Sequence, residues 1–198
     1  RLIREHGLVG RRIVEIGCGK GEFLAILCRD GRNQGLGFDA SYDGSVDEAV
    51  AGHVRIVREH FSEASVRDPA DLVCCRHVLQ AVPRARDIIA ELARVTRPGG
   101  WLHLIAEDYA MLHSEPAPLD TDEFWQQGPV AYTARTDTDA RIGRRAFSML
   151  RALGCTELRV ELTGDRGERS ERVWLHPGSF DAASVVDRVR WQLGEDAE

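Results

Sequence analysis

The stretch that decides the fold is Val14-Glu15-Ile16-Gly17-Cys18-Gly19-Lys20-Gly21. A β-branched run over residues 12–16 predicts a short strand that stops at Gly17, and apolar residues at helical spacing over 22–28 predict a helix after it. The alternate glycines let the chain turn tightly off the strand and bring its backbone against a ligand. The helix that follows presents free N–H groups and a partial positive charge at its start. The sequence therefore predicts a ligand-binding loop between the strand and the helix.

The spacing of the glycines separates two classes of cofactor. A dinucleotide loop has the pattern Gly-x-Gly-x-x-Gly and needs a small residue at position 22. Glu22 stands there and would repel a pyrophosphate, whereas Glu15 precedes the glycines as a carboxylate placed to receive a cation. S-adenosylmethionine (SAM) carries an α-ammonium and a sulfonium but no phosphate. The loop therefore favours SAM over NAD.

The rest of the first half alternates strand and helix signals. Strands are predicted over residues 35–39, 54–57, 70–75 and 101–105, and helices over 43–51 and 87–96. The 70–75 run is apolar throughout, as expected when both faces of a parallel sheet are covered. The alternation predicts a parallel sheet with helices on both faces, and ligands bind such sheets at the carboxyl ends of the strands.

The second half is less regular. Residues 108–140 combine prolines and acids with weak periodicity, which predicts an irregular insertion. A helix over 142–153, strands over 156–162 and 172–175, and a helix over 182–193 are predicted beyond it. The prediction is an α/β fold within one domain over residues 1–198. We expect a Rossmann-like, doubly wound, mainly parallel seven-stranded sheet in three α/β/α layers.

At four places the sequence resembles the class I SAM-dependent methyltransferases. The glycine loop matches their first motif, Glu/Asp-x-Gly-x-Gly-x-Gly, and Asp39 ends the second strand 18 positions after Gly21. Residues 70–83 resemble the fourth-strand segment of the family, and Arg97-Pro98-Gly99-Gly100-Trp101 resembles its turn before the fifth strand. The resemblance covers residues 10–110, with a looser fit to about 160. Gln80 and Ala81 depart from it, because the family often has Glu-His there.

The resemblance implies a cofactor site, in which Asp39 would chelate the ribose hydroxyls and Glu15 would orient the cofactor. The expected cofactor-binding residues are Glu15, Gly17, Cys18, Gly19, Gly21, Asp39, Phe61, Ser62, Cys75 and Arg76. The alternative for Glu15 is a surface ion pair with Arg11 or Arg12. Phe61 either packs on the adenine or belongs to the core, and Ser62 would bond the adenine edge.

The expected catalytic residues on the acceptor side are His77, Tyr109 and His113. His77 follows the fourth strand and is either a base or an orienting residue; its alternative is a helix-starting residue bonded to backbone. Acids and aromatics alternate over residues 119–125, which suits a cationic or amine-bearing acceptor or else a lid that packs down. His113 with Asp120 and Asp122 matches no compact metal site, so no metal is expected.

The activity implied is transfer of the SAM methyl group to a small-molecule acceptor, with S-adenosylhomocysteine as product. N-, O- and C-methylation all remain open at this point. A second hypothesis is a non-catalytic SAM-binding subunit that supports a partner enzyme. A third is a nucleotide-dependent oxidoreductase, which the glycine spacing disfavours.

Composition limits the partners. The net charge of −6 and the pI near 5.7 lack the basic excess of a nucleic-acid-binding protein, so neither nucleic acid nor an anionic membrane is expected as a partner. The five cysteines include no Cys-x-x-Cys pair, which favours a reducing, cytoplasmic environment, and we find neither a signal peptide nor a membrane-spanning run. We expect a monomer or homodimer. The chain starts at Arg1 without Met, so we expect native residues before it.

Overall fold

The computed structural model describes residues 2–44, 52–111 and 121–160. The chain divides into two compact units, residues 1–153 and 154–198, and every helix and strand described below belongs to the first. In the second unit the structure describes residues 154–160, which form neither helix nor strand. The prediction of one domain over residues 1–198 stays a prediction.

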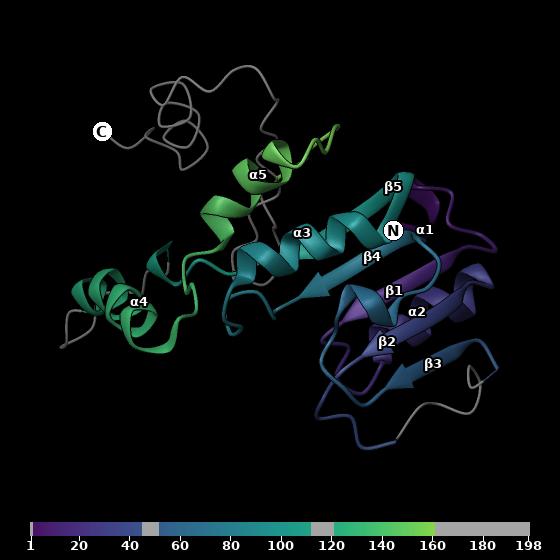
Figure 1. Cartoon of the computed structure of the whole chain (residues 1–198), viewed down its shortest axis with the longest axis horizontal. Helices are drawn as coiled ribbons and strands as arrows, with labels where there is room; N and C mark the ends of the chain where they lie inside the picture. The colour runs from purple at the N-terminus through teal and green to yellow at the C-terminus, as the bar shows by residue number, and fades with distance from the viewer. Residues whose placement is uncertain (1, 45–51, 112–120, 161–198) are drawn as a thin grey trace, which may run out of the picture. The chain divides into compact units, whose positions relative to one another are not determined.

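The first unit is built on a parallel five-stranded sheet (Figure 1). Its strands, in the order β3-β2-β1-β4-β5, are Val54–Val57, Gln34–Phe38, Arg12–Ile16, Ala70–Arg76 and Thr96–Ile105. The chain runs outward from the central β1 to β3 and then crosses back to place β4 on the other side of β1. The carboxyl ends of β1 and β4 therefore flank the switch point, where ligands bind in open sheets of this kind.

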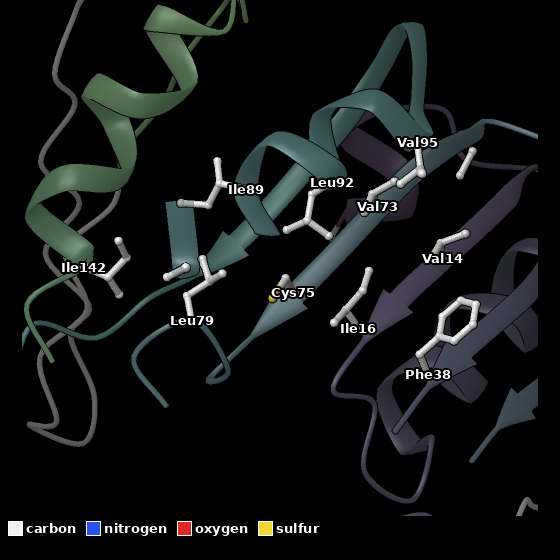
Figure 2. Packing of buried hydrophobic residues seen from close by; sticks show 12 residues of the cluster. Val14, Ile16, Phe38, Val73, Cys75, Leu79, Ile89, Leu92, Val95 and Ile142 are labelled. Carbon is white, nitrogen blue, oxygen red and sulfur yellow. The ribbon is translucent and has the colours of Figure 1, made fainter. Parts of the chain in front are cut away.

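Helices cover both faces of the sheet. The helices are α1 (Leu2–Glu5), α2 (Glu22–Gly31), α3 (Ala85–Val95), α4 (Asp122–Thr136) and α5 (Gly143–Ala152), with short 3-10 turns η2 (Glu63–Ser65) and η3 (Tyr109–Met111). Alternate residues of β4 point to opposite faces, as in any strand. Leu72 and Cys74 pack in the cluster beneath α2, while Val73 and Cys75 pack in the cluster beneath α3. Figure 2 shows Ile89 and Leu92 of α3 turned toward this second cluster. The three-layer arrangement is confirmed.

Most predicted elements of the first half are confirmed, with β1 and β3 matching their predicted bounds. The fifth strand begins at Thr96 rather than at residue 101, because Pro98-Gly99-Gly100 forms an irregularity inside the β4–β5 ladder and does not precede it. The irregular insertion predicted over 108–140 is wrong in part: α4 lies within it. This helix contains Gly128 and Pro129 and has no apolar stripe, so periodicity could not reveal it.

Several predicted elements fall at or beyond the edges of the described residues. The strand predicted over 156–162 is absent from residues 156–160, the part of it that the structure describes. Of the helix predicted over 43–51, residues 43 and 44 are not helical and the remainder lies outside the described residues, as do the elements predicted over 172–175 and 182–193. Five of the seven predicted strands are thus observed. Among the helices that the structure describes, none is long and apolar enough to cross a membrane.

The α3 face supplies a direct test of this packing. Leu92 is fully buried between α3 and the sheet (Figure 2). Because Leu92→Ala leaves a cavity there, we expect it to lower the free energy of unfolding by about 3 kcal/mol. Leu153→Ala is the control, since Leu153 is 45% exposed, and it should change stability by less than about 1 kcal/mol. Urea unfolding of both variants measures the difference, and equal losses would contradict the packing.

Candidate active site

The glycine loop at the carboxyl end of β1 has an alternating backbone conformation. Gly17, Gly19 and Gly21 have φ angles of 66°, 55° and 80°, all in the left-handed region that glycine adopts readily. The Gly17 N–H donates a 2.8 Å hydrogen bond to the Phe38 carbonyl, and the Gly21 N–H donates one of 2.8 Å to the Cys18 carbonyl. The alternate spacing in the sequence therefore reflects three left-handed residues in one turn.

Two of the three glycines are required by packing, and the third faces open space. A Cβ at Gly17 would lie 2.1 Å from Val78 Cγ2, and a Cβ at Gly21 would lie 2.4 Å from Ile56 Cδ1. A Cβ at Gly19 would meet no atom within 4 Å. The open space beside Gly19 is where a ligand can approach the backbone of the loop.

This difference predicts opposite outcomes for two matched substitutions. Gly17→Val should lose several kcal/mol of stability, because it adds a steric collision to the backbone strain. Gly19→Val should lose only about 1–2 kcal/mol from the left-handed backbone, yet abolish binding of S-adenosylhomocysteine by filling the ligand's space. Urea unfolding and calorimetry separate the two effects. Full ligand affinity in a folded Gly19→Val variant would refute the assignment of the loop.

Asp39 lies beside this loop, immediately after β2. Its Oδ2 accepts the Gly19 N–H at 2.7 Å, and its Oδ1 accepts both the N–H and the hydroxyl of Ser41, at 2.8 and 2.6 Å. Burial acts to raise the pKa of Asp39, but the hydrogen bonds from Ser41 and Gly19 outweigh it, and the pKa is lowered. The carboxylate is therefore ionised at neutral pH and half-exposed next to the open space at Gly19. These properties fit the ribose role, which stays a prediction.

The residues predicted to hold adenine lie after β3. The Phe61 ring packs edge-on against Phe38, with ring centroids 5.6 Å apart, and is partly buried against the core. Ser62 is exposed, and its carbonyl accepts the Ser65 N–H at 3.0 Å. Phe61 thus belongs to the margin of the core, and adenine contacts by either residue stay predictions.

Glu15 is fully buried on the α2 side of β1. Its Oε1 accepts a 3.0 Å hydrogen bond from Arg76 Nε, and Oε2 has no partner among the described residues. Burial raises the pKa of Glu15, and the Arg76 guanidinium only partly offsets this. The alternative of a surface ion pair with Arg11 or Arg12 is wrong, because Glu15 is buried and has Arg76 as its partner. No motif in the sequence predicts this pair, because the pairing depends on the register between β1 and β4.

The two cysteines predicted near the cofactor are buried thiols. Cys18 lies in the loop and Cys75 in the α3-facing core (Figure 2), and burial raises the pKa of each to about 12. Both are therefore protonated and poor nucleophiles at neutral pH. The side chain of Cys75 packs in the hydrophobic core. A contribution of either cysteine to cofactor binding stays a prediction.

Glu107 brings together two of the predicted catalytic residues. His77 Nδ1 lies 2.6 Å from Glu107 Oε1, and the Tyr109 hydroxyl lies 3.5 Å from Oε2, a long contact. His77 follows β4 in a left-handed conformation, with φ 57°. Its backbone N–H donates a 2.9 Å hydrogen bond to the Ile105 carbonyl of β5. His77 therefore does not begin a helix, because α3 starts only at Ala85. No motif in the sequence links Glu107 to His77.

The hydrogen bond to Glu107 sets the roles of the two imidazole nitrogens. An ionised carboxylate only accepts, so in the neutral ring Nδ1 carries the proton and Nε2 keeps a free lone pair. The His77 side chain is 57% exposed. Burial raises the pKa of Tyr109, and Glu107 raises it further, which keeps the phenol protonated as a donor to Glu107. In this arrangement Nε2 is the ring nitrogen that can accept a proton, and the catalytic role of His77 stays a prediction.

An aromatic side chain of α4 lies next to this group. The Trp125 ring is nearly parallel to the Tyr109 ring, at 14° and 6.4 Å between centroids. His113 lies outside the described residues, so its predicted catalytic role stays a prediction. Within residues 2–44, 52–111 and 121–160, no group of His, Cys, Asp and Glu is arranged to hold a metal ion.

A doubly wound parallel sheet with an acidic, alternate-glycine loop at its switch point is typical of the class I SAM-dependent methyltransferases. Residues 14–104 match the family described as a methyltransferase domain. The fold and this match support the resemblance of the segment to the class I SAM-dependent methyltransferases.

Two curated relatives are ubiquinone biosynthesis O-methyltransferases. The one from Methylococcus capsulatus is 32% identical over 108 residues, which is 50% of this chain and 45% of the relative. The one from Klebsiella pneumoniae is 27% identical over 103 residues, 49% of this chain and 43% of the relative. The chain thus spans less than half the length of these relatives.

Solved structures show the same fold at low sequence identity. An O-methyltransferase family protein from Burkholderia thailandensis superposes with a TM-score of 0.57 at 17% identity, over 83% of this chain and 52% of that one. Phosphoethanolamine N-methyltransferase 2 from Haemonchus contortus gives 0.54 at 16% identity, over 79% of this chain and 36% of that one. The shared fold does not select between oxygen and nitrogen acceptors.

Proposed function

We propose that this protein transfers the methyl group of SAM to a hydroxyl group of a small molecule. The observation that carries the proposal is the left-handed glycine loop, open at Gly19 and flanked by the half-exposed carboxylate of Asp39. Asp39 fits a ligand with hydroxyl groups, and its ionised carboxylate would repel a diphosphate. The names of the two curated relatives support an oxygen acceptor.

The residues around the loop would hold the cofactor. Gly17 to Gly21 would offer their backbone as one wall, and Asp39 would accept hydrogen bonds from the ribose hydroxyls through its remaining lone pairs. When bound, SAM supplies an electrophilic methyl group on a positively charged sulfur. The protein's remaining tasks are to align the acceptor and to take up its proton.

His77 and Glu107 are suited to that proton transfer. A neutral hydroxyl becomes a better nucleophile as its proton passes to Nε2 of His77. The Glu107 carboxylate then stabilises the imidazolium through Nδ1 and keeps the ring oriented. Tyr109 and Trp125 provide apolar surface beside the base, which suits an acceptor with an aromatic or other flat apolar body.

The compartment proposed is the cytoplasm. All five cysteines lie in described parts of the chain and are free thiols, four of them buried. Free thiols support a reducing environment. The acidic charge supports a small molecule rather than nucleic acid as acceptor, and a monomer or homodimer stays the expectation.

Calorimetric titration with S-adenosylhomocysteine and with NAD tests the cofactor. We expect the former to bind and the latter not to bind. Asp39→Ala should weaken the binding of S-adenosylhomocysteine by about tenfold or more, because charged hydrogen bonds to the ribose are lost. The substitution also removes the hydrogen bonds of Asp39 to Gly19 and Ser41, so urea unfolding is needed to show that the variant is still folded. Tight binding of NAD alone would overturn the proposal, and unchanged affinity in Asp39→Ala would place the ribose elsewhere.

Loss of the base tests the catalytic assignment. With the best acceptor from a panel of hydroxylated aromatics and amines, His77→Ala should lower kcat by about 10²–10⁴-fold and leave S-adenosylhomocysteine affinity unchanged. His53→Ala is the matched control, since His53 is also exposed but bonds Gln34 beside the amino end of β3. Equal rates for wild type and His77→Ala would remove His77 from the chemistry. Cofactor binding without turnover of any acceptor would favour the non-catalytic subunit.

A further inference from the structure

The first turn of α5 carries two arginines. Arg144 and Arg145 directly follow Gly143, the first residue of the helix. A positive charge there is unfavourable, because it adds to the positive end of the helix dipole. Each arginine pairs with a carboxylate, Arg144 with Asp108 and Arg145 with Asp139, and their side chains are 45% and 44% exposed. Two neighbouring residues of one type thus have similar surroundings and the same kind of partner.

The two ion pairs differ in what they join. Asp139 lies six residues before Arg145, so that pair is local. Asp108 lies 36 residues before Arg144, in the segment that leaves β5, and its side chain is only 6% exposed. Its carboxylate binds the guanidinium at two points, Oδ2 to Nε and Oδ1 to Nη2, the second at 2.8 Å. A two-point pair fixes the orientation of its partners as well as their separation.

Backbone contacts strengthen the connection between the end of β5 and the start of α5. The Gly143 N–H donates to the Glu107 carbonyl at 3.1 Å, and the Tyr109 N–H donates to the Ala140 carbonyl at 3.0 Å. A Cβ at Gly143 would lie 2.7 Å from the Ala106 carbonyl oxygen, so this close approach requires glycine. The backbone on either side of the ion-paired aspartate is therefore fixed to the start of α5.

The segment held in this way carries the partner of His77. Glu107 Oε1 lies 2.6 Å from His77 Nδ1, and Glu107 is the residue directly before Asp108. Glu107 lies beyond β5, which ends at Ile105, so the ladder of the sheet does not hold its backbone. A misplacement of about 1 Å can lower the rate of a reaction by about 10²-fold. The contacts from α5 thus supply the support that a precisely placed carboxylate needs.

We propose that Arg144 is a positioning residue for proton transfer, which holds Asp108 at two points and so keeps the Glu107 carboxylate on Nδ1 of His77. This inference rests on the proposed function, because it assumes that His77 takes the proton of the acceptor. The contribution is to orientation rather than to stability, since an ion pair with a half-exposed partner adds little to the stability of a fold. Arg145, in the local pair, has no such role.

Matched double variants test this role. Asp108→Asn/Arg144→Met removes the pair without leaving a buried, unpaired carboxylate. With the best acceptor from the panel, it should lower kcat by about tenfold or more and leave the affinity for S-adenosylhomocysteine unchanged. The control, Asp139→Asn/Arg145→Met, makes the same two substitutions in the local pair and should keep the wild-type kcat. In both pairs the aspartate also accepts the backbone N–H two residues on, a hydrogen bond that Asn retains.

A second comparison separates positioning from a general loss of structure. In His77→Ala the proton acceptor is gone, so the position of Glu107 no longer matters. Adding Asp108→Asn/Arg144→Met to His77→Ala should therefore lower kcat no further. A purely structural role would lower kcat by the same factor in both backgrounds.

The outcomes separate this inference from the function on which it rests. A wild-type kcat in the folded Asp108→Asn/Arg144→Met variant overturns the role of Arg144, as does an equal loss in the control or in the His77→Ala background. If wild type methylates no acceptor, or if His77→Ala keeps the wild-type kcat, the proposed function or its base fails and the inference fails with it. Urea unfolding shows which variants are folded. Should the test variant be unfolded, Arg144→Lys replaces it, and an undiminished kcat in that variant would contradict two-point positioning.

Discussion

Three left-handed residues in one short turn are the constraint on which the site depends. The turn leaves no room for side chains at Gly17 and Gly21, because Val78 and Ile56 pack directly against its backbone. Its amides also bond the carbonyl of Phe38 at the end of the neighbouring strand. The loop is therefore shaped by contacts from β2, β3 and the segment after β4. Its open side, at Gly19, is left for a ligand.

The two carboxylates near this turn, Asp39 and Glu15, differ in burial and in the direction of their pKa shifts. Asp39 is half-exposed, and its hydrogen bonds to Gly19 and Ser41 lower its pKa despite burial, so it carries charge at neutral pH. Burial raises the pKa of Glu15, which depends on Arg76 for compensation. The result is a half-exposed carboxylate after β2 and a partly exposed guanidinium at the end of β4. The carboxylate suits a ligand with hydroxyl groups.

Sequence patterns predicted the sheet and the loop well because these are local features. Apolar runs mark β1 and β4, and the alternate glycines mark the turn between β1 and α2. α4 was missed because Gly128, Pro129 and exposed aromatics such as Phe124 hide any apolar stripe. The Glu15–Arg76 and His77–Glu107 pairs were missed for another reason: each joins residues whose proximity is fixed only by the register of neighbouring strands. Residue types near the site could be predicted, but their partners could not.

A crystal structure of the protein soaked with S-adenosylhomocysteine tests the central claim, that the turn after β1 is a backbone cradle for a sulfonium amino acid. The account predicts ligand density against residues 17–21, with the ribose hydroxyls within hydrogen-bond distance of Asp39 and the sulfur near the carboxyl end of β4. An empty turn, with the adenosine bound at a different edge of the sheet, would contradict it.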